Sequence, residues 1–463
     1  MLHKTLSGLS IISLSMLLAG CLSLDPHYQR PAAPVPQTWP EQSNNADARA
    51  VLTDWQQVLT DHRLHDVVQR ALVSNRDLQK SIADIEAARA LYGEQRASLF
   101  PTLNAALNHT RSRTASDGVS SSAEAEGSVS SFELDLFGRN QSLTRAAKET
   151  WLASEATAQN TRITLVTETT TAWITLAADK SNLALTQQTM ASAADSLRIT
   201  QLKLNQGSAA AGDVSEAMTT YQQARASVAD YQTLVAQDIN ALNLLMGETV
   251  PENLLPGTLE SLSPQAISLV PAGVSSSVLL RRPDVLEAEH NLKSENADIG
   301  AARANFFPTL SLTASAGAGS SSLSNLFGHG TNIWSFAPSI TLPLFTGGSN
   351  LAQLHYAEAE KKGLIASYQK AIQTAFEDVA NALARRRTLN EQLDAQQQAV
   401  AAARRSYDLA RRAYEVGTGD YLTVLTDQRT LWSTRLDLVS VQQTDFENRI
   451  TLWQSLGGGV DAG

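Results

Sequence analysis

Residues 139 to 206 form a run of 68 positions without glycine or proline, and this run limits the possible folds more than any other feature. An unbroken helix of that length would extend roughly 100 Å, several times the diameter of a small domain. Its apolar side chains are sparse and small, which favours close packing along neighbouring helices over burial in a globular core. The same composition is too polar for a membrane-spanning helix. Leu364 to Val416 is a second run, of 53 residues, which predicts about 80 Å of helix.

Each long run ends in a short glycine-rich turn that leads into another helix. These turns are Gly207 to Asp213 and Gly417 to Asp420. Glycine favours the end of a helix, and aspartate favours the N-cap of the next one. Two long helices joined by a short turn are expected to be antiparallel, so the sequence predicts helical hairpins over 139–247 and 349–456. A shorter helix is expected over 283–306, with a proline near its first turn.

Two similar octapeptides mark positions where a helix gives way to a strand. Arg-Ala-Ser-Leu-Phe-Pro-Thr-Leu begins at Arg96 and Arg-Ala-Asn-Phe-Phe-Pro-Thr-Leu begins at Arg303, an offset of 207 (303 − 96). The proline ends the helix because it disfavours helical geometry in the preceding residue and lacks an N–H donor. The glycine–aspartate pairs of the two turns have the same offset, which makes a chance repeat a poor explanation. The chain is therefore predicted to contain two copies of one half-molecule, over 54–270 and 271–463.

Alternating apolar and polar side chains follow each octapeptide, which indicates β-strands. Such strands are expected at about 102–113, 124–137, 309–319 and 332–345, with serine- and glycine-rich loops at 112–122 and 320–330. Most of these segments are near the ~9–11 residues of a membrane strand. The alternation fits both a soluble half-buried sheet and membrane strands whose polar face lines water. The N-terminal sequence and the long helices favour the membrane strands.

The number of strands bears on how many copies of the chain assemble. Four strands cannot close a barrel, and an open sheet edge in lipid leaves backbone groups without hydrogen bonds. Small single-chain barrels have about eight strands. Several chains must therefore share one barrel, to which two copies would contribute roughly eight strands and three copies roughly twelve. The strand pattern does not choose between these assemblies.

The first 20 residues have the organisation of a secretory signal peptide. Lys4 precedes an uncharged apolar run that ends in Leu18-Ala19-Gly20-Cys21. This tetrapeptide resembles the bacterial lipobox, in which the cysteine is lipidated and becomes the new N-terminus; the alternative is an ordinary signal with an incidental cysteine. Leu22 follows where inner-membrane lipoproteins typically carry aspartate, so the resemblance implies the outer membrane. Residues 21–53 are polar and proline-rich, which predicts an extended tether.

Charge and motif content exclude several classes of function. The formal net charge is −10, and −11 after removal of the first 20 residues with Lys4, so no basic excess exists for nucleic-acid binding. A single cysteine excludes an internal disulfide. We find no phosphate loop, nucleophile elbow or dinucleotide fingerprint, and we predict neither an enzyme nor a cofactor. His62, His65 and Asp66 could share a helix face as metal ligands, but a solvated helix face is the preferred interpretation.

Five short motifs occur together in this chain: the lipobox, Tyr28-Gln29-Arg30-Pro31, Leu280-Arg281-Arg282-Pro283-Asp284, Gly300-Ala301-Ala302-Arg303 leading to Phe307-Pro308, and Leu456-Gly457-Gly458-Gly459. Together they resemble the TolC-like outer membrane factors, and most closely their lipoprotein branch, the NodT-type subunits of resistance-nodulation-division efflux systems. The resemblance implies a mainly α fold with a membrane β-barrel portion: a homotrimer with a shared twelve-stranded barrel and a long periplasmic α-helical barrel. It also implies a periplasmic adaptor and an inner-membrane pump as partners, with passive conduction of drugs, toxic compounds or metal ions.

In this family the periplasmic ends of the helical hairpins close the tunnel and contact the adaptor. The family often has a Tyr-Leu-x-Val-Leu-Asp-Ala pattern there, whereas this chain has Thr426 at the acidic position and Asp427 one residue later. We hypothesise that Leu422 and Asp420 narrow the tunnel; the alternative is that Asp420 only caps a helix. The candidate gate and adaptor residues are Gly207, Gly212, Asp213, Tyr414, Gly417, Thr418, Gly419, Asp420, Leu422, Thr426 and Asp427.

Two other functions are compatible with the same sequence features. One is the exit duct of a type I protein secretion system, which shares the architecture. The other is a periplasmic coiled-coil lipoprotein that acts as a scaffold and has a soluble sheet. The sequence does not identify the cargo.

Overall fold

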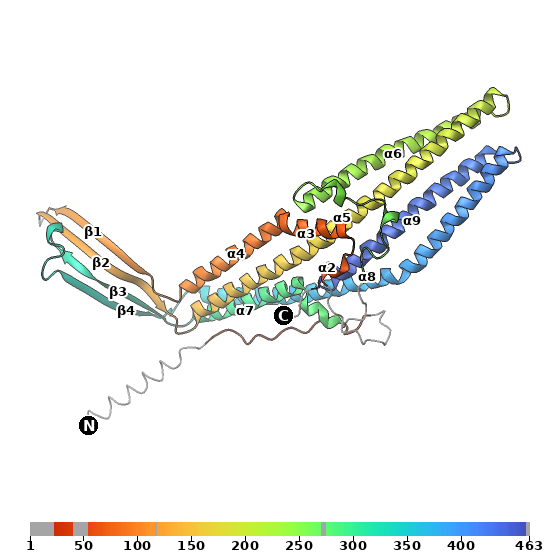
Figure 1. The fold of residues 1–463 in the computed structure, drawn as a ribbon. Helices are drawn as coiled ribbons and strands as arrows, with labels where there is room; N and C mark the ends of the chain where they lie inside the picture. Colours follow the sequence, from red (N-terminus) through yellow and green to blue (C-terminus); the bar gives the residue numbers. More distant parts are fainter. Residues whose placement is uncertain (1–22, 40–53, 116–117, 270–274, 460–463) are drawn as a thin grey trace. The chain divides into compact units, whose positions relative to one another are not determined.

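The computed structural model describes residues 23–39, 54–115, 118–269 and 275–459 (Figure 1). Two compact units are formed from interleaved segments: unit 1 contains Met1–Ala33, Ala83–Ala156 and Leu286–Lys370, and unit 2 contains Pro34–Ile82, Thr157–Val285 and Ala371–Gly463. Each unit takes segments from both predicted halves of the chain, so the units are not the two repeats. Unit 1 contains the sheet, and unit 2 contains both glycine-rich turns.

The helices and strands follow the predicted order along the described chain. The helices are α2 (Trp55–Val58), α3 (His62–Ser74), α4 (Arg76–Ala97), α5 (Arg139–Asn205), α6 (Ala211–Met246), α7 (Pro283–Ala304), α8 (Ser349–Glu415) and α9 (Tyr421–Ser455), and the strands are β1 (Leu103–Thr114), β2 (Gly118–Leu134), β3 (Thr309–Ser320) and β4 (Asn332–Thr341). Both α5 and α8 are single helices of 67 residues. No helix in the described ranges is long and apolar enough to cross a membrane.

Unit 1 contains one four-stranded antiparallel sheet in the order β1-β2-β3-β4, as Figure 1 shows. Each strand pairs with the next along the chain, and a bulge between Val129 and Phe132 interrupts the β2–β3 ladder. In the described chain neither outer edge of the sheet, on β1 or on β4, has a partner strand. Large apolar side chains are exposed at alternate positions, including Trp334 at 80% and Ile340 at 72%. The sheet is therefore open at both edges and apolar on a solvent-exposed face.

The predicted loop at 112–122 is wrong in position. Strand β2 begins at Gly118, six residues before the expected start, and residues 118–122 pair with 110–114 of β1. The serine-rich composition suggested a loop, but the backbone groups of serine form strand hydrogen bonds as well as those of other residues do. In addition, the Ser112 and Ser120 hydroxyls hydrogen-bond across the hairpin at 2.9 Å. Strand β4 ends at Thr341 rather than at 345, consistent with the proline at 343, which has no N–H to donate.

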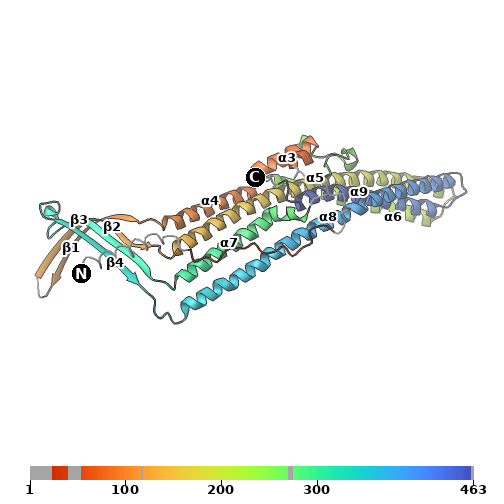
Figure 2. The same ribbon diagram turned by 90° about the horizontal axis from the view of Figure 1, so that it is seen from below.

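Helices α4, α5, α7 and α8 lie side by side within unit 1 (Figure 2). Tyr92 of α4 stacks on Trp151 of α5, with ring centroids 5.8 Å apart. His290 of α7 is 2.7 Å from a carboxylate oxygen of α5, and Lys361 of α8 donates to Asn296 of α7 at 2.6 Å. Small side chains also pack between these helices, since Ala302 of α7 and Ala357 of α8 are buried in one apolar cluster.

The N-terminal segment of unit 1 is extended but bound to the helices along its length. Asp25 accepts a hydrogen bond from the Ser142 hydroxyl at 2.6 Å and forms an ion pair with Arg145 at 2.7 Å. Gly300 of α7 provides the necessary space, because a Cβ atom there would collide with the Asp25 carboxylate. The backbone carbonyl of Pro26 accepts a hydrogen bond from the next turn of α7.

Glu289 of α7 is the second anchor of this segment. Its side chain is 3% exposed and accepts two hydrogen bonds from Arg30, at 3.0 and 2.7 Å, and one from Tyr28 at 3.2 Å. Lys293 adds a further ion pair at 3.1 Å. These contacts give a structural reason for the Tyr28-Gln29-Arg30-Pro31 motif. The predicted tether is therefore docked in its described residues; Cys21 and residues 40–53 lie outside the described ranges.

Candidate functional site

The turn between α5 and α6, which we term the first tip turn, is held by backbone and side-chain hydrogen bonds. Gly207 has a φ of +71°, the left-handed geometry that ends many helices. The Ser208 N–H and hydroxyl both donate to the Lys203 carbonyl, at 2.9 and 3.1 Å. The Asp213 carboxylate accepts from the Ala210 N–H at 3.0 Å, so it satisfies a free donor at the start of α6.

The turn between α8 and α9, the second tip turn, repeats this construction. Gly417 has a φ of +80°, and the Thr418 N–H and hydroxyl donate to the Ala413 carbonyl at 2.9 and 3.2 Å. Asp420 is the N-cap of α9: it accepts from the Thr423 N–H at 2.8 Å and from the Thr423 hydroxyl at 2.9 Å. These hydrogen bonds hold the pKa of the Asp420 carboxyl below its usual value.

The two tip turns correspond at an offset of 210, not at the 207 that the sequence suggested. Gly207 matches Gly417 (417 − 207 = 210), and the N-cap of α6, Ala210, matches the N-cap of α9, Asp420 (420 − 210 = 210). Gly212 lies inside α6, whereas Gly419 remains in the turn. The matching Gly-Asp pairs gave the wrong offset because they do not occupy equivalent positions. An aspartate can accept hydrogen bonds from the free N–H groups at the start of a helix either from the N-cap or from the third helical position.

Above the turns, side chains from all four long helices form one apolar cluster in unit 2. Its members are Leu197 of α5, Ala217 of α6, Tyr407, Ala410 and Tyr414 of α8, and Tyr421, Val424 and Leu425 of α9. The Tyr414 and Tyr421 rings lie 5.2 Å apart, and Lys203 Nζ is 3.6 Å from the centre of the Tyr414 ring. Tyr414 therefore packs inside the bundle. The cluster joins the two helical hairpins next to both tip turns, because its members come from α5, α6, α8 and α9.

The exposed face of α9 contains two of the three remaining predicted gate residues. Leu422 is 59% exposed, and the Thr426 hydroxyl donates to the Leu422 carbonyl at 2.9 Å, so these two residues share a face as predicted. Asp427 is half-buried and lies off this face. Sequence reasoning missed Arg429, whose guanidinium donates to the Thr220 hydroxyl of α6 at 3.1 Å. The signal was available, since Arg429 follows Leu422 by seven residues (429 − 422), which is two helical turns.

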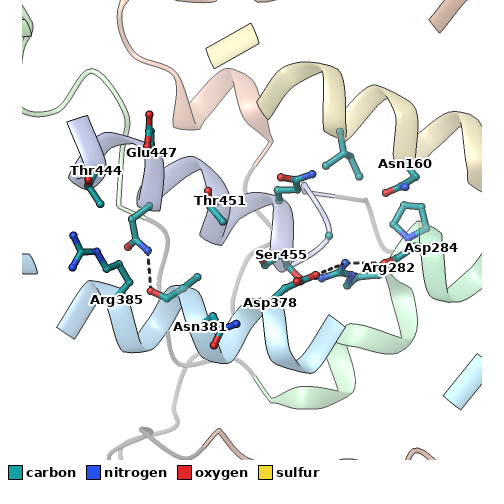
Figure 3. A pocket seen from close by; sticks show the side chains of 16 residues that line it. Asn160, Arg282, Asp284, Asp378, Asn381, Arg385, Thr444, Glu447, Thr451 and Ser455 are labelled. Atoms are coloured by element: carbon teal, nitrogen blue, oxygen red, sulfur yellow. Dashed lines mark hydrogen bonds and ion pairs between the residues drawn. The ribbon is translucent and has the colours of Figure 1, made fainter. Parts of the chain in front are cut away.

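A pocket of unit 2, with a volume of about 500 Å³, lies beside Arg282 (Figure 3). Arg282 is 8% exposed and donates to both carboxylate oxygens of Asp284 at 3.0 and 2.7 Å, to Asp378 of α8 at 3.2 Å, and to the Ser455 carbonyl of α9 at 2.8 Å. The arginine of the Leu280-Arg281-Arg282-Pro283-Asp284 motif thus connects the start of α7 to α8 and to the end of α9. Its hydrogen-bonding groups are used in holding the fold.

Of the two neighbouring histidines on α3, His62 is exposed and His65 is packed. His65 stacks on Trp55, with ring centroids 4.9 Å apart, and its Nδ1 atom is 3.7 Å from Asp66. Within the described ranges, no group of three or more histidine, cysteine, aspartate or glutamate side chains could hold a metal ion.

Comparison with known proteins places this architecture in a family. A family model described as "Outer membrane efflux protein" matches residues 67–248 and 274–458, which together cover most of the chain. The chain belongs to this outer membrane efflux protein family. The two matched segments correspond to the two halves that the sequence repeat suggested, although the boundaries of the repeats remain a prediction.

Individual relatives agree with this assignment. The chain is 42% identical over 467 residues to the toluene efflux pump outer membrane protein TtgC and to the antibiotic efflux pump outer membrane protein ArpC, both of Pseudomonas putida; each match covers 98% of this chain and 96% of the relative. Its fold is similar to the open state of the MtrE outer membrane channel of Neisseria gonorrhoeae, with a TM-score of 0.86 and 34% identity over 95% of this chain and 99% of that one. This chain is an outer membrane channel of a tripartite efflux pump and extends into the periplasm.

Proposed function

We propose that three copies of this chain form a passive exit duct with a shared twelve-stranded barrel. The observation that carries the proposal is the four-stranded sheet, which in the described chain is unpaired at both edges and exposes large apolar side chains. In lipid such edges must be paired, because no water is present to satisfy their backbone groups. Two copies would supply eight strands and three would supply twelve; resemblance to the TolC-like factors favours three.

The cargo proposed here is a class of small apolar or amphipathic molecules, including aromatic solvents and antibiotics. The names of TtgC and ArpC support it, since one states toluene and the other antibiotic efflux. A periplasmic adaptor and an inner-membrane resistance-nodulation-division pump would deliver the cargo and supply the energy. No arrangement of side chains described above suggests covalent chemistry, so the duct contributes passage rather than a reaction.

Transport by the intact system provides the first test. A strain that lacks its own outer membrane efflux channels, but keeps an adaptor and a pump, would receive this chain and be challenged with toluene and with antibiotics. We expect tolerance to return, and native mass spectrometry of the detergent-extracted protein to give the mass of three chains. Unchanged sensitivity together with a monomeric mass would refute the exit duct and favour the scaffold interpretation.

The gate is proposed to lie at the second tip turn, where Leu422 and Asp420 narrow the tunnel. Leu422 supports this by its exposure next to the turn, at 59%. The Leu422→Ala and Asp420→Asn variants would be compared by single-channel conductance in planar bilayers. Asparagine retains the helix cap and removes only the charge. Leu409→Ala is a matched control, because Leu409 is 60% exposed on α8 away from the turn.

We expect the Leu422 variant to raise conductance and the Asp420 variant to change ion selectivity, with the Leu409 variant equal to the wild type. If neither substitution near the turn changes conductance or selectivity, the gate assignment is wrong. The other turn residues proposed for contact with the adaptor, from Gly207 to Asp213 and from Gly417 to Asp420, would be tested by site-specific cross-linking to that partner.

Lipid attachment at Cys21 is also proposed. Asp25 is docked against α5 and α7 in unit 1, and four residues of chain can reach at most roughly 14 Å. A lipid on Cys21 would therefore be held close to the helices that adjoin the strands. Mass spectrometry of the mature N-terminal peptide should show a lipid-modified cysteine, and the Cys21→Ser variant should retain its signal peptide.

A further inference from the structure

Helices α5, α8 and α9 line a smaller polar cavity in unit 2, which is partly open to solvent and shares Tyr407 with the apolar cluster. Its volume is 170 Å³, and its lining includes Arg404 and Asp408 of α8 together with Gln428, Trp432 and Arg435 of α9. It shares no lining residue with the pocket beside Arg282. Tyr407 and Leu431 also line it.

Three buried polar atoms on this lining have no hydrogen-bond partner in the described chain. Gln428 is 5% exposed, and both its amide nitrogen and its amide oxygen are unpaired. The indole nitrogen of Trp432 is also buried and unpaired. Buried polar groups in folded proteins are almost always hydrogen-bonded. We therefore expect a polar molecule or ion in the cavity that hydrogen-bonds to these three atoms. Its volume equals that of about five or six water molecules at roughly 30 Å³ each.

The charges on the lining indicate which polar occupant fits. Arg404 and Arg435 contribute two positive charges, and Asp408 contributes one negative charge. Burial and the neighbouring Arg404 guanidinium lower the pKa of Arg435, whereas the Asp408 carboxylate raises it, so the two cations repel each other and Asp408 offsets part of that repulsion. An anion between them would relieve that repulsion. Guanidinium, indole and amide groups are all N–H donors, and guanidinium presents its donors in the planar fork that suits oxyanions.

We propose that this cavity is a binding site for a small tetrahedral oxyanion of the phosphate or sulfate class. Arg435 and Arg404 would supply the charge-assisted hydrogen bonds, and Trp432 Nε1 and the Gln428 amide nitrogen would complete the donor set. The bound anion would join α9 to α8 at a position about 1.7 helical turns along α9 from Leu422 (428 − 422 = 6 residues for Gln428). The site goes beyond the exit-duct function and does not depend on the gate assignment.

Inorganic phosphate is the probe for the test. The intact protein in detergent would be titrated calorimetrically with phosphate, and its thermal midpoint followed with phosphate or with sodium chloride at equal ionic strength. Variants Arg435→Gln and Gln428→Leu remove a donor each. Arg411→Gln is the matched control, because Arg411 is an exposed arginine on the same helix as Arg404, paired with Glu415 at 3.6 Å.

We expect saturable binding by the wild type, a higher thermal midpoint in phosphate than in chloride, and at least tenfold weaker binding by Arg435→Gln. Gln428→Leu should also lose the phosphate response, while its midpoint in chloride stays at or above that of the wild type, which separates lost binding from lost folding. Arg411→Gln should bind as the wild type does. Absence of binding heat, or a midpoint shift that chloride reproduces, would mean that only water fills the cavity and would overturn the proposal. An undiminished phosphate response in Arg435→Gln would overturn it as well.

Discussion

Substitution of Arg282 by glutamine should destabilise unit 2 substantially. The guanidinium makes two hydrogen bonds to Asp284, one to Asp378 and one to the Ser455 carbonyl, and the residue is only 8% exposed. Glutamine is too short to reach all three partners and carries no charge. The substitution therefore removes the connection among the start of α7, the middle of α8 and the last turn of α9.

The expected magnitude follows from the burial of each partner. Breaking a buried ion pair from one side typically costs about 3–5 kcal/mol, because the remaining charge is left without a partner. The Asp284 and Asp378 side chains are 30% and 43% exposed, so water can solvate them again, and the cost of the broken ion pairs falls to about 1–2 kcal/mol, between the buried and the surface case. The Ser455 carbonyl, in the last turn of α9, loses a charged donor worth about 1.5–3 kcal/mol. We expect a total loss of about 3 kcal/mol, which for a chain of this size corresponds to a fall of roughly 3–6 °C in thermal midpoint.

The assay is the thermal midpoint of the detergent-solubilised protein, followed by intrinsic tryptophan fluorescence. Arg281→Gln is the matched control, because Arg281 is the neighbouring residue of the same motif and is exposed; its change should stay within about 0.5 kcal/mol. Equal midpoints for the two variants, or a midpoint for Arg282→Gln within 1 °C of wild type (on the order of the control's change), would refute the argument that Arg282 is a structural connector.

Two further predictions concern the N-terminal segment and the dependence of stability on pH. Gly300→Ala should displace the N-terminal segment, because the added Cβ would meet the Asp25 carboxylate and its backbone nitrogen; limited proteolysis should then cleave this segment faster than in the wild type. Burial and the neighbouring Asp179 carboxylate raise the pKa of Asp238 to about 6. The stability that this group contributes is present below its unfolded pKa and is lost as pH rises through about 6, so the thermal midpoint should fall between pH 5 and pH 8. Asp238→Asn should reduce that fall, by on the order of 1 kcal/mol after solvent screening.

The helices and their ends were the part of the fold that the sequence predicted best. The absence of glycine and proline between 139 and 206 predicts α5 almost to the residue, since only a helix uses such a run without interruption. Pro283 begins α7 as predicted, because its missing N–H is unused at a first helical position. These features are local, and local chemistry decides them.

Features that depend on distant residues could not be predicted in the same way. The tether looked free because its prolines exclude regular structure, yet docking depends on Glu289 and Gly300, which are more than 250 residues away in sequence (289 − 30 = 259; 300 − 25 = 275). The buried, unpaired amide of Gln428 could not be predicted from the sequence either. A glutamine on a helix is expected to be exposed to solvent unless the residues packed around it are known.

The two tip turns show how a repeated half can acquire separate roles. In the first turn the carboxylate of Asp213 belongs to the first turn of α6 and is half-buried, so its charge is used in holding the end of α6. In the second turn the carboxylate of Asp420 is exposed, and Leu422 is exposed two residues later. The two turns have the same length, 206–210 and 416–420, so the difference lies in the position of the aspartate: Asp420 is the N-cap itself, which places the charged and the apolar side chain together at the end of the hairpin. This asymmetry supports assignment of the proposed gate to the α8–α9 hairpin rather than to α5–α6.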